Sequence, residues 1–248
     1  MAYIPNMNSP NPQRIIPSSF ECIQAIRAPE LYRNFAIHLF VMLPAAIAMC
    51  AIAARIDSKM NYVFPLEHPH TAYLGLSLIG IGGMWVWYVY GYLFLAGGGS
   101  PGTHVDGGPV RMVDTGPYTA IRHPSVLGKL LGVTGLGIIW QSQTFLLGFL
   151  PILVIYSVVS NRLLQERFCE DRFGERYSQY RDRVPMLIPR LSGLSRWKSG
   201  KPALNAIELV SVATQPPSVW QEFRWYLVGL IGLIVCFSGM AVMTQLTH

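Results

Sequence analysis

The sequence has few charged residues and no apolar segment at its start. Only 13% of its 248 residues are charged, whereas 51% are hydrophobic, and the mean hydropathy is +0.34. A soluble domain carries more charge on its surface, so this composition indicates a membrane protein. Residues 1–33 are rich in Pro, Asn and Ser and lack the apolar core of a signal peptide, so we expect no cleaved signal peptide.

Metal-binding and phosphate-binding motifs are also lacking. The cysteines at positions 22, 50, 169 and 236 form no CxxC pair, and the histidine pair His68 and His70 is weak evidence by itself, so we predict no metal site. The glycine-rich stretch 97–114 contains no GxxxxGK[ST] phosphate loop. The net charge of +6 suits a membrane protein beside anionic lipid, and we predict the lipid bilayer, not nucleic acid, as partner.

Long uncharged runs are what the sequence does contain. A helix needs roughly 20 apolar residues to cross a bilayer, and the uncharged blocks lie at 34–54, 71–96, 130–161 and 225–248. The third block is too long for one span, and Gln141–Thr144 interrupts it, so we predict a helical hairpin with limbs at about 124–140 and 144–164. The expected fold is all-α and polytopic, with about five transmembrane helices and a cytoplasmic cofactor pocket after the hairpin.

The distribution of Lys and Arg predicts the orientation of these spans. If the N-terminus is cytoplasmic, only Arg55 and Lys59 among the 19 basic residues lie on the outer side. The predicted parts of the chain are an N-terminal arm with an interfacial helix (1–33), two transmembrane helices (34–96), a core of loop, hairpin and cytoplasmic helices (97–190), a basic linker (191–224) and a C-terminal transmembrane helix (225–248).

A polar loop, Gly116–Pro124, lies between two uncharged blocks. Its two prolines disfavour helix at the residues before them, so the loop has a defined shape and presents Tyr118, Arg122 and His123. These side chains are common in interfacial anchors, and they also suit the wall of a binding pocket. Because a short hairpin joins the loop to the charged segment 162–190, we expect the two segments to be neighbours on the cytoplasmic side.

Two ordered motifs together carry a resemblance to a known family. The first is Gly-Pro-Tyr-x4-His-Pro at 116–124. The second, after the hairpin, is Glu166-x6-Phe-Gly-x2-Tyr177-x2-Tyr180, followed by Val-Pro-x3-Pro at 184–189. This pattern resembles the isoprenylcysteine carboxyl methyltransferases and the related phospholipid methyltransferases, which are integral-membrane enzymes that use S-adenosyl-L-methionine. The resemblance covers about residues 97–189 and includes bacterial members, so the bacterial inner membrane is the expected location.

The resemblance implies a cofactor pocket between the loop and the helices after the hairpin. The implied catalytic residues are His123, Arg122 and Glu166. The implied cofactor-binding residues are Gly116, Pro117, Tyr118, Arg122, His123, Pro124, Glu166, Tyr177 and Tyr180. Arg122 or His123 would suit the cofactor carboxylate, Glu166 its ammonium or a ribose hydroxyl, and the tyrosines the adenine face. The methyl acceptor would be lipid-like or a small hydrophobic molecule with a carboxylate, amine or thiol.

The sequence departs from this family at two positions. Related sequences often carry two consecutive acids where this chain has Gln165 and Glu166, and a basic residue where it has Met186. One alternative is a membrane enzyme similar to sterol reductases, which uses NADPH. Another is a non-catalytic scaffold of the same fold.

Overall fold

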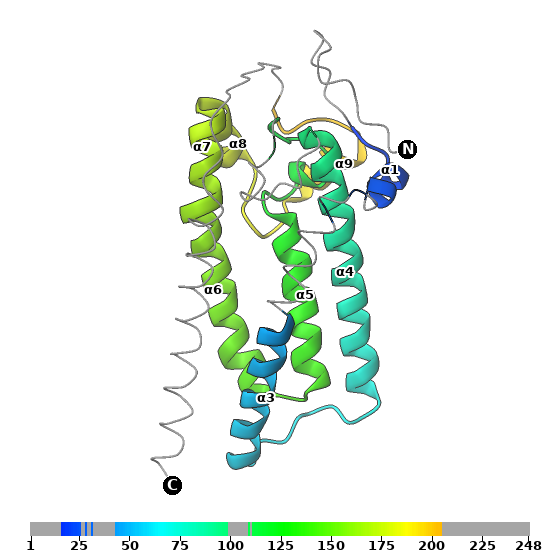
Figure 1. Ribbon diagram of the computed structural model, residues 1–248, viewed down its shortest axis with the longest axis vertical. Helices are drawn as coiled ribbons and strands as arrows, with labels where there is room; N and C mark the ends of the chain where they lie inside the picture. The colour runs from blue at the N-terminus through cyan, green and yellow to red at the C-terminus, as the bar shows by residue number, and fades with distance from the viewer. Residues whose placement is uncertain are drawn as a thin grey trace. The chain divides into compact units, whose positions relative to one another are not determined.

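The computed structural model describes residues 16–25, 28, 31, 43–98, 109 and 111–204. Every regular element in these ranges is helical, which confirms the all-α prediction for the part of the chain that they cover. Figure 1 follows the helices from α1 to α9. The described residues form two compact units. Unit 1 holds those within 16–31, 84–127 and 158–204, and unit 2 holds those within 43–83 and 128–157.

Two of the described helices are long and apolar enough to cross a membrane. One is α4, His70–Gly97, and the other is the continuous helix Phe145–Phe173. The second helix consists of η5 (Phe145–Phe149), α6 (Leu150–Ser160), η6 (Asn161–Glu166) and α7 (Arg167–Phe173). The predicted span at 225–248 lies outside the described residues. Of the span predicted at 34–54, the structure describes only the part within α3, Leu43–Lys59.

The predicted hairpin is present. Its first limb is α5, Pro124–Ile139, a shorter apolar helix, and its second limb begins after the polar turn at Gln141–Thr144. Gln141 has a positive φ of 52°, which reverses the chain between the limbs. The polar interruption read from the sequence is therefore the hairpin turn itself.

The side chains of this turn hold the connection between α3 and α4. Asp57, buried near the end of α3, accepts hydrogen bonds from the Ser142 hydroxyl and from the backbone N–H and hydroxyl of Thr144. Gln141 donates to the Leu66 carbonyl at 3.0 Å, and Gln143 donates to the Val63 carbonyl at 2.6 Å. These bonds satisfy a buried carboxylate and the polar groups of two connections within unit 2.

Small residues allow α4 and α5 to approach closely within unit 2. A Cβ added at Gly75 would lie 2.6 Å from the Gly135 carbonyl oxygen, and a Cβ at Gly135 would lie 2.5 Å from the Gly75 carbonyl oxygen. No side chain larger than hydrogen fits at either position. Small residues at a helix interface permit backbones to approach in this way.

Unit 1 contains the short helices around the predicted site. A 3-10 turn, η4 (Gly116–Thr119), precedes α5, and α8 (Glu175–Arg183) follows α7. Gly174, with φ 56°, is the glycine cap that ends α7. Helix α9, Leu191–Lys198, occupies the start of the segment predicted as a basic linker. The described part of the predicted interfacial helix is α1, Ser19–Gln24.

Candidate active site

The loop that contains Arg122 and His123 is shaped by its glycine and prolines. Gly116 has φ +58°, and a Cβ there would lie 2.5 Å from a ring carbon of Tyr92, so only glycine fits both the conformation and the space. Pro117 lies in the first turn of η4, and Pro124 begins α5. All three residues are buried, and the prediction of a shaped loop at 116–124 is confirmed.

The backbone of this loop is paired with the chain segment that follows α8. The N–H of Arg122 donates to the Pro185 carbonyl at 2.9 Å, and the N–H of His123 donates to the Met186 carbonyl at 3.2 Å. In the opposite direction, the N–H of Arg190 donates to the Ala120 carbonyl at 3.3 Å. These bonds fix the backbone at Arg122 and His123, two of the predicted site residues.

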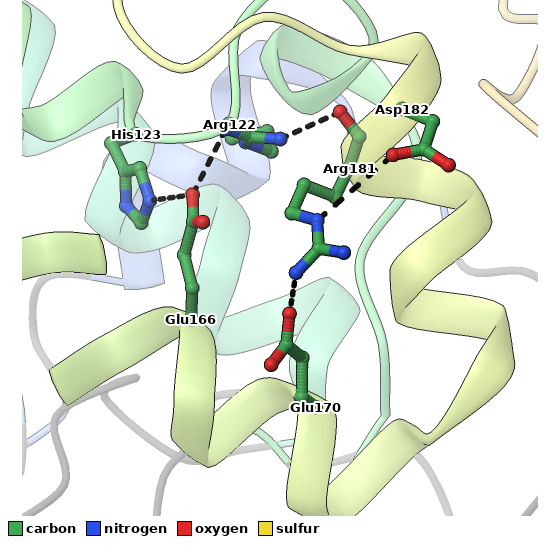
Figure 2. A network of polar contacts seen from close by, with 6 residues as sticks. All are labelled: Arg122, His123, Glu166, Glu170, Arg181 and Asp182. Carbon is green, nitrogen blue, oxygen red and sulfur yellow. Dashed lines mark hydrogen bonds and ion pairs between the residues drawn. The ribbon is translucent and has the colours of Figure 1, made fainter. Parts of the chain in front are cut away.

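Glu166 brings the second motif into contact with the loop. It lies at the end of the π-helical turn η6, and only 3% of its side chain is exposed. Its Oε1 atom lies 3.1 Å from Nη2 of Arg122 and 3.2 Å from Nε2 of His123, as Figure 2 shows. A π-turn adds a residue to a helical turn and changes the direction of the following side chains, and such turns are frequent at functional sites.

The guanidinium of Arg122 joins this site to α8. Its Nη1 atom donates to the Arg181 carbonyl at 2.6 Å, and the side chain of Arg181 pairs with Glu170 and lies 4.0 Å from Asp182 (Figure 2). The Nε atom of Arg122 is buried and has no hydrogen-bond partner among the described residues. A buried donor of this kind is costly without a partner, so Arg122 retains capacity to bind an acceptor.

Three tyrosines of the predicted site are buried in the same unit. Tyr118, Tyr177 and Tyr180 are 8%, 5% and 3% exposed, and the Tyr180 hydroxyl donates to the Tyr118 carbonyl at 2.8 Å. Burial raises the pKa of each of these phenols above its ordinary value. They therefore stay neutral at physiological pH, as hydrogen-bonding and packing groups without charge.

The structure brings together the predicted site residues, and their cofactor roles stay predictions. Arg122, His123 and Glu166 are in direct contact, and Tyr180 bonds the loop backbone beside Tyr118. A cavity of about 510 Å³ lies instead in unit 2, and none of the predicted site residues lines it. Sequence reasoning missed the contribution of Arg181, because a carbonyl acceptor leaves no signature in a sequence.

Comparison with known proteins points to the same family that the two motifs resemble. The family model of phospholipid methyltransferases matches residues 70–176, a range that contains the loop, the hairpin and Glu166. Residues 70–176 are therefore similar to phospholipid methyltransferases. The expected family resemblance is thus confirmed. The match to this family and the two long apolar helices both indicate association with a membrane.

Two curated relatives are similar to part of the chain. The cobalt-zinc-cadmium resistance protein CzcN of Cupriavidus metallidurans is 31% identical over 129 residues, which cover 50% of this chain and 51% of that protein. The nickel-cobalt-cadmium resistance protein NccN of Alcaligenes xylosoxydans xylosoxydans is 28% identical over 123 residues, with 48% of each chain covered. The chain therefore spans about half the length of these relatives. No solved structure matches it.

The names of these relatives concern metal resistance. Within the ranges that the structure describes, no group of three or more His, Cys, Asp and Glu side chains could hold a metal ion.

Proposed function

We propose that this protein is an integral-membrane methyltransferase that transfers a methyl group from S-adenosylmethionine to a lipid-like or small hydrophobic acceptor. The observation that carries the proposal is the contact of Arg122 and His123 with Glu166. It joins the two motifs that the family shares, although 43 positions separate His123 from Glu166 in the chain. The active site and the N-terminus are assigned to the cytoplasmic side, where the cofactor is available.

The groups at this site fit the cofactor chemically. S-adenosylmethionine carries a carboxylate and an ammonium at one end and adenosine at the other. Arg122 has a buried Nε without a partner among the described residues, so it suits the carboxylate, while the carboxylate of Glu166 suits the ammonium or a ribose hydroxyl. The neutral tyrosines Tyr177 and Tyr180 offer aromatic faces for the adenine.

The residues of the chain act mainly by positioning. When bound, the cofactor supplies an electrophilic methyl group on a sulfonium, and no covalent enzyme intermediate is required. Arg122 and Glu166 would fix the cofactor so that its methyl group faces the acceptor, and the buried surroundings would exclude water. In this proposal, His123 would accept a proton from an acceptor that must lose one.

The direct test is calorimetric binding to the full chain purified in detergent. S-adenosylmethionine and S-adenosylhomocysteine are titrated into the wild type, His123→Ala and Glu166→Ala, and NADPH serves as control ligand. We expect micromolar binding of both adenosyl ligands, weakened by each substitution. Binding of NADPH alone would replace the proposal with a reductase, and the absence of binding by any ligand would favour a non-catalytic scaffold.

The names of the relatives suggest a second assay for the same site. If this chain contributes to metal resistance, we propose that it does so through methyl transfer at His123. Expression in a metal-sensitive bacterial host should then raise the tolerated cobalt concentration for the wild type but not for His123→Ala. If His123→Ala still confers cobalt resistance, that resistance does not depend on methyl transfer at this site.

A further inference from the structure

The segment 184–204, which we call the strap, differs in charge from the helices before it. Residues 162–183 alternate acids and bases, whereas the strap contains no Asp or Glu. Its charged residues are all basic: Arg190, Arg196, Lys198 and Lys201. The four side chains are exposed. The strap therefore presents positive charge to its surroundings, which favours an anionic partner.

The strap also exposes large apolar side chains beside these charges. Ile188 is 81% exposed and Leu191 is 84% exposed, although they flank a segment whose backbone packs against the site. Two large aliphatic side chains this exposed, three positions apart on one short segment, form a small apolar patch that a lipid surface could cover. Apolar side chains surrounded by Lys and Arg are typical of a segment that lies at a membrane interface.

We propose that the strap docks on an anionic lipid surface. Ile188 and Leu191 would enter the apolar region below the headgroups, and the basic side chains of α9 would remain at the phosphates, as long cationic side chains do at interfaces. A lipid surface is the occupant that fits best, because two described helices of this chain are long and apolar enough to cross a membrane.

The strap is also the segment that holds the functional loop. As described above, the carbonyls of Pro185 and Met186 accept hydrogen bonds from the backbone N–H groups of Arg122 and His123. Gly193 of α9 packs so closely on the loop that a Cβ there would lie 2.5 Å from both the Thr119 carbonyl oxygen and the Ala120 Cα. The Thr119 hydroxyl lies 2.9 Å from the Gly193 carbonyl oxygen.

Aromatic contacts join the other side of α9 to α4. Trp197 meets the ring of Trp85 edge-on, with centroids 5.7 Å apart, and stacks on Tyr88 at 6.2 Å. Trp85 in turn donates from its indole N–H to the Pro124 carbonyl at 2.7 Å. Helix α9 thus contacts both the loop 116–124 and α4 within unit 1, so we expect a displacement of the strap to disturb the backbone that carries Arg122 and His123.

Lipid docking should therefore raise the affinity of the site for its cofactor, a consequence that rests on the proposed function. The docking itself does not rest on it. Two measurements separate them: hydrogen exchange of the strap backbone, which needs no cofactor, and calorimetric titration of S-adenosylmethionine. Both are made on the full chain in nanodiscs of phosphatidylcholine alone and of phosphatidylcholine mixed with phosphatidylglycerol.

The decisive variant is Lys198→Gln with Lys201→Gln. Its matched control is Arg55→Gln with Lys59→Gln, which removes the same charge from exposed positions outside the strap. In anionic nanodiscs the wild type and the control should show slower exchange at 190–198 and tighter cofactor binding. Each lysine removed from the strap should reduce the protection by about fivefold, because a basic residue near an anionic surface contributes about 1 kcal/mol. The double substitution Ile188→Ser with Leu191→Ser should reduce the protection of the strap backbone from hydrogen exchange in both kinds of nanodisc.

Each other outcome overturns a defined part of the inference. Equal strap exchange in the two lipids, or equal losses for variant and control, would exclude docking on anionic lipid. A lipid-dependent exchange with unchanged cofactor affinity would support docking and exclude its coupling to the site. A lipid-dependent exchange with no cofactor binding in either nanodisc would support docking and contradict the proposed function instead.

Discussion

Nε2 of His123 lies 3.2 Å from Oε1 of Glu166, and both side chains are almost fully buried, with 10% and 3% of their surface exposed. The two residues come from the two motifs that flank the hairpin. Because a buried carboxylate requires partners, Glu166 holds the loop to the helices after the hairpin, and the proposed function gives it the cofactor to bind as well. This double role makes the site sensitive to conservative changes.

Glu166→Gln should weaken the binding of S-adenosylmethionine by about 10- to 100-fold. The amide keeps the size of the side chain but loses the charge that faces Arg122, and hydrogen bonds to charged groups contribute about 1.5–3 kcal/mol. Calorimetric titration measures the change. Glu170→Gln is the matched control, because it makes the same substitution in the partly exposed pair with Arg181, where an ion pair contributes at most about 1 kcal/mol. Equal effects of the two substitutions would contradict a specific role for Glu166.

Gly193→Ala should lower the thermal stability of the protein. The new methyl group would overlap the backbone of Thr119 and Ala120, and such overpacking typically costs about 1–3 kcal/mol. The expected fall in Tm is about 2–4 °C for each kcal/mol. Gly132→Ala is the control, because no atom lies within 4 Å of a Cβ at that position, and it should be neutral or slightly stabilising. A wild-type Tm for Gly193→Ala would show that α9 can move away from the loop at little cost.

The stability of the protein should fall as the pH rises above about 10. Burial raises the pKa values of Tyr118, Tyr177 and Tyr180 in the folded protein. Above the ordinary phenol pKa, the unfolded chain loses these protons while the folded chain keeps them, so unfolding is favoured by at most about 1.4 kcal/mol per tyrosine and pH unit. Their stabilising effect is complete below pH 10 and is lost progressively up to the raised pKa values.

Tyr180→Phe tests this dependence by thermal unfolding between pH 8 and 11. At neutral pH it should cost about 1 kcal/mol, because the hydrogen bond to the Tyr118 carbonyl is lost. At alkaline pH its stability should fall less steeply than that of the wild type. Tyr62→Phe, at a half-exposed position, serves as control. An unchanged slope for Tyr180→Phe would assign the alkaline transition to other groups.

Asp57→Ala should destabilise the hairpin turn by about 2–3 kcal/mol. The substitution removes the acceptor of three hydrogen bonds from Ser142 and Thr144 and leaves their donors without it inside unit 2. Thermal unfolding in detergent measures the loss, and Ser58→Ala, at the next and exposed position, is the control. Cofactor binding at temperatures well below Tm should remain, since Asp57 belongs to a different unit from Glu166.

The sequence by itself determined the helical class and the hairpin, and it predicted residues that the structure brings into contact, Arg122, His123 and Glu166. Uncharged runs can only be buried or placed in lipid, so the helices α4 and α5 and the helix Phe145–Phe173 could be located from composition. The polar turn at Gln141–Thr144 and the glycine cap at Gly174 follow from local backbone chemistry, which acts over a few residues and is visible in a linear pattern.

Only the tertiary structure decided how the hairpin turn and the site are each held. Asp57 bonds the hairpin turn, Arg122 donates to the Arg181 carbonyl, and Gly193 packs on Ala120. All three contacts join segments that lie far apart in the sequence. Backbone carbonyls and close approaches of main chains carry no residue-specific pattern, so no sequence motif could reveal them. For the same reason the sequence predicted α9 only as part of a linker. In the structure, its backbone packs on the loop 116–124 and its tryptophan contacts α4.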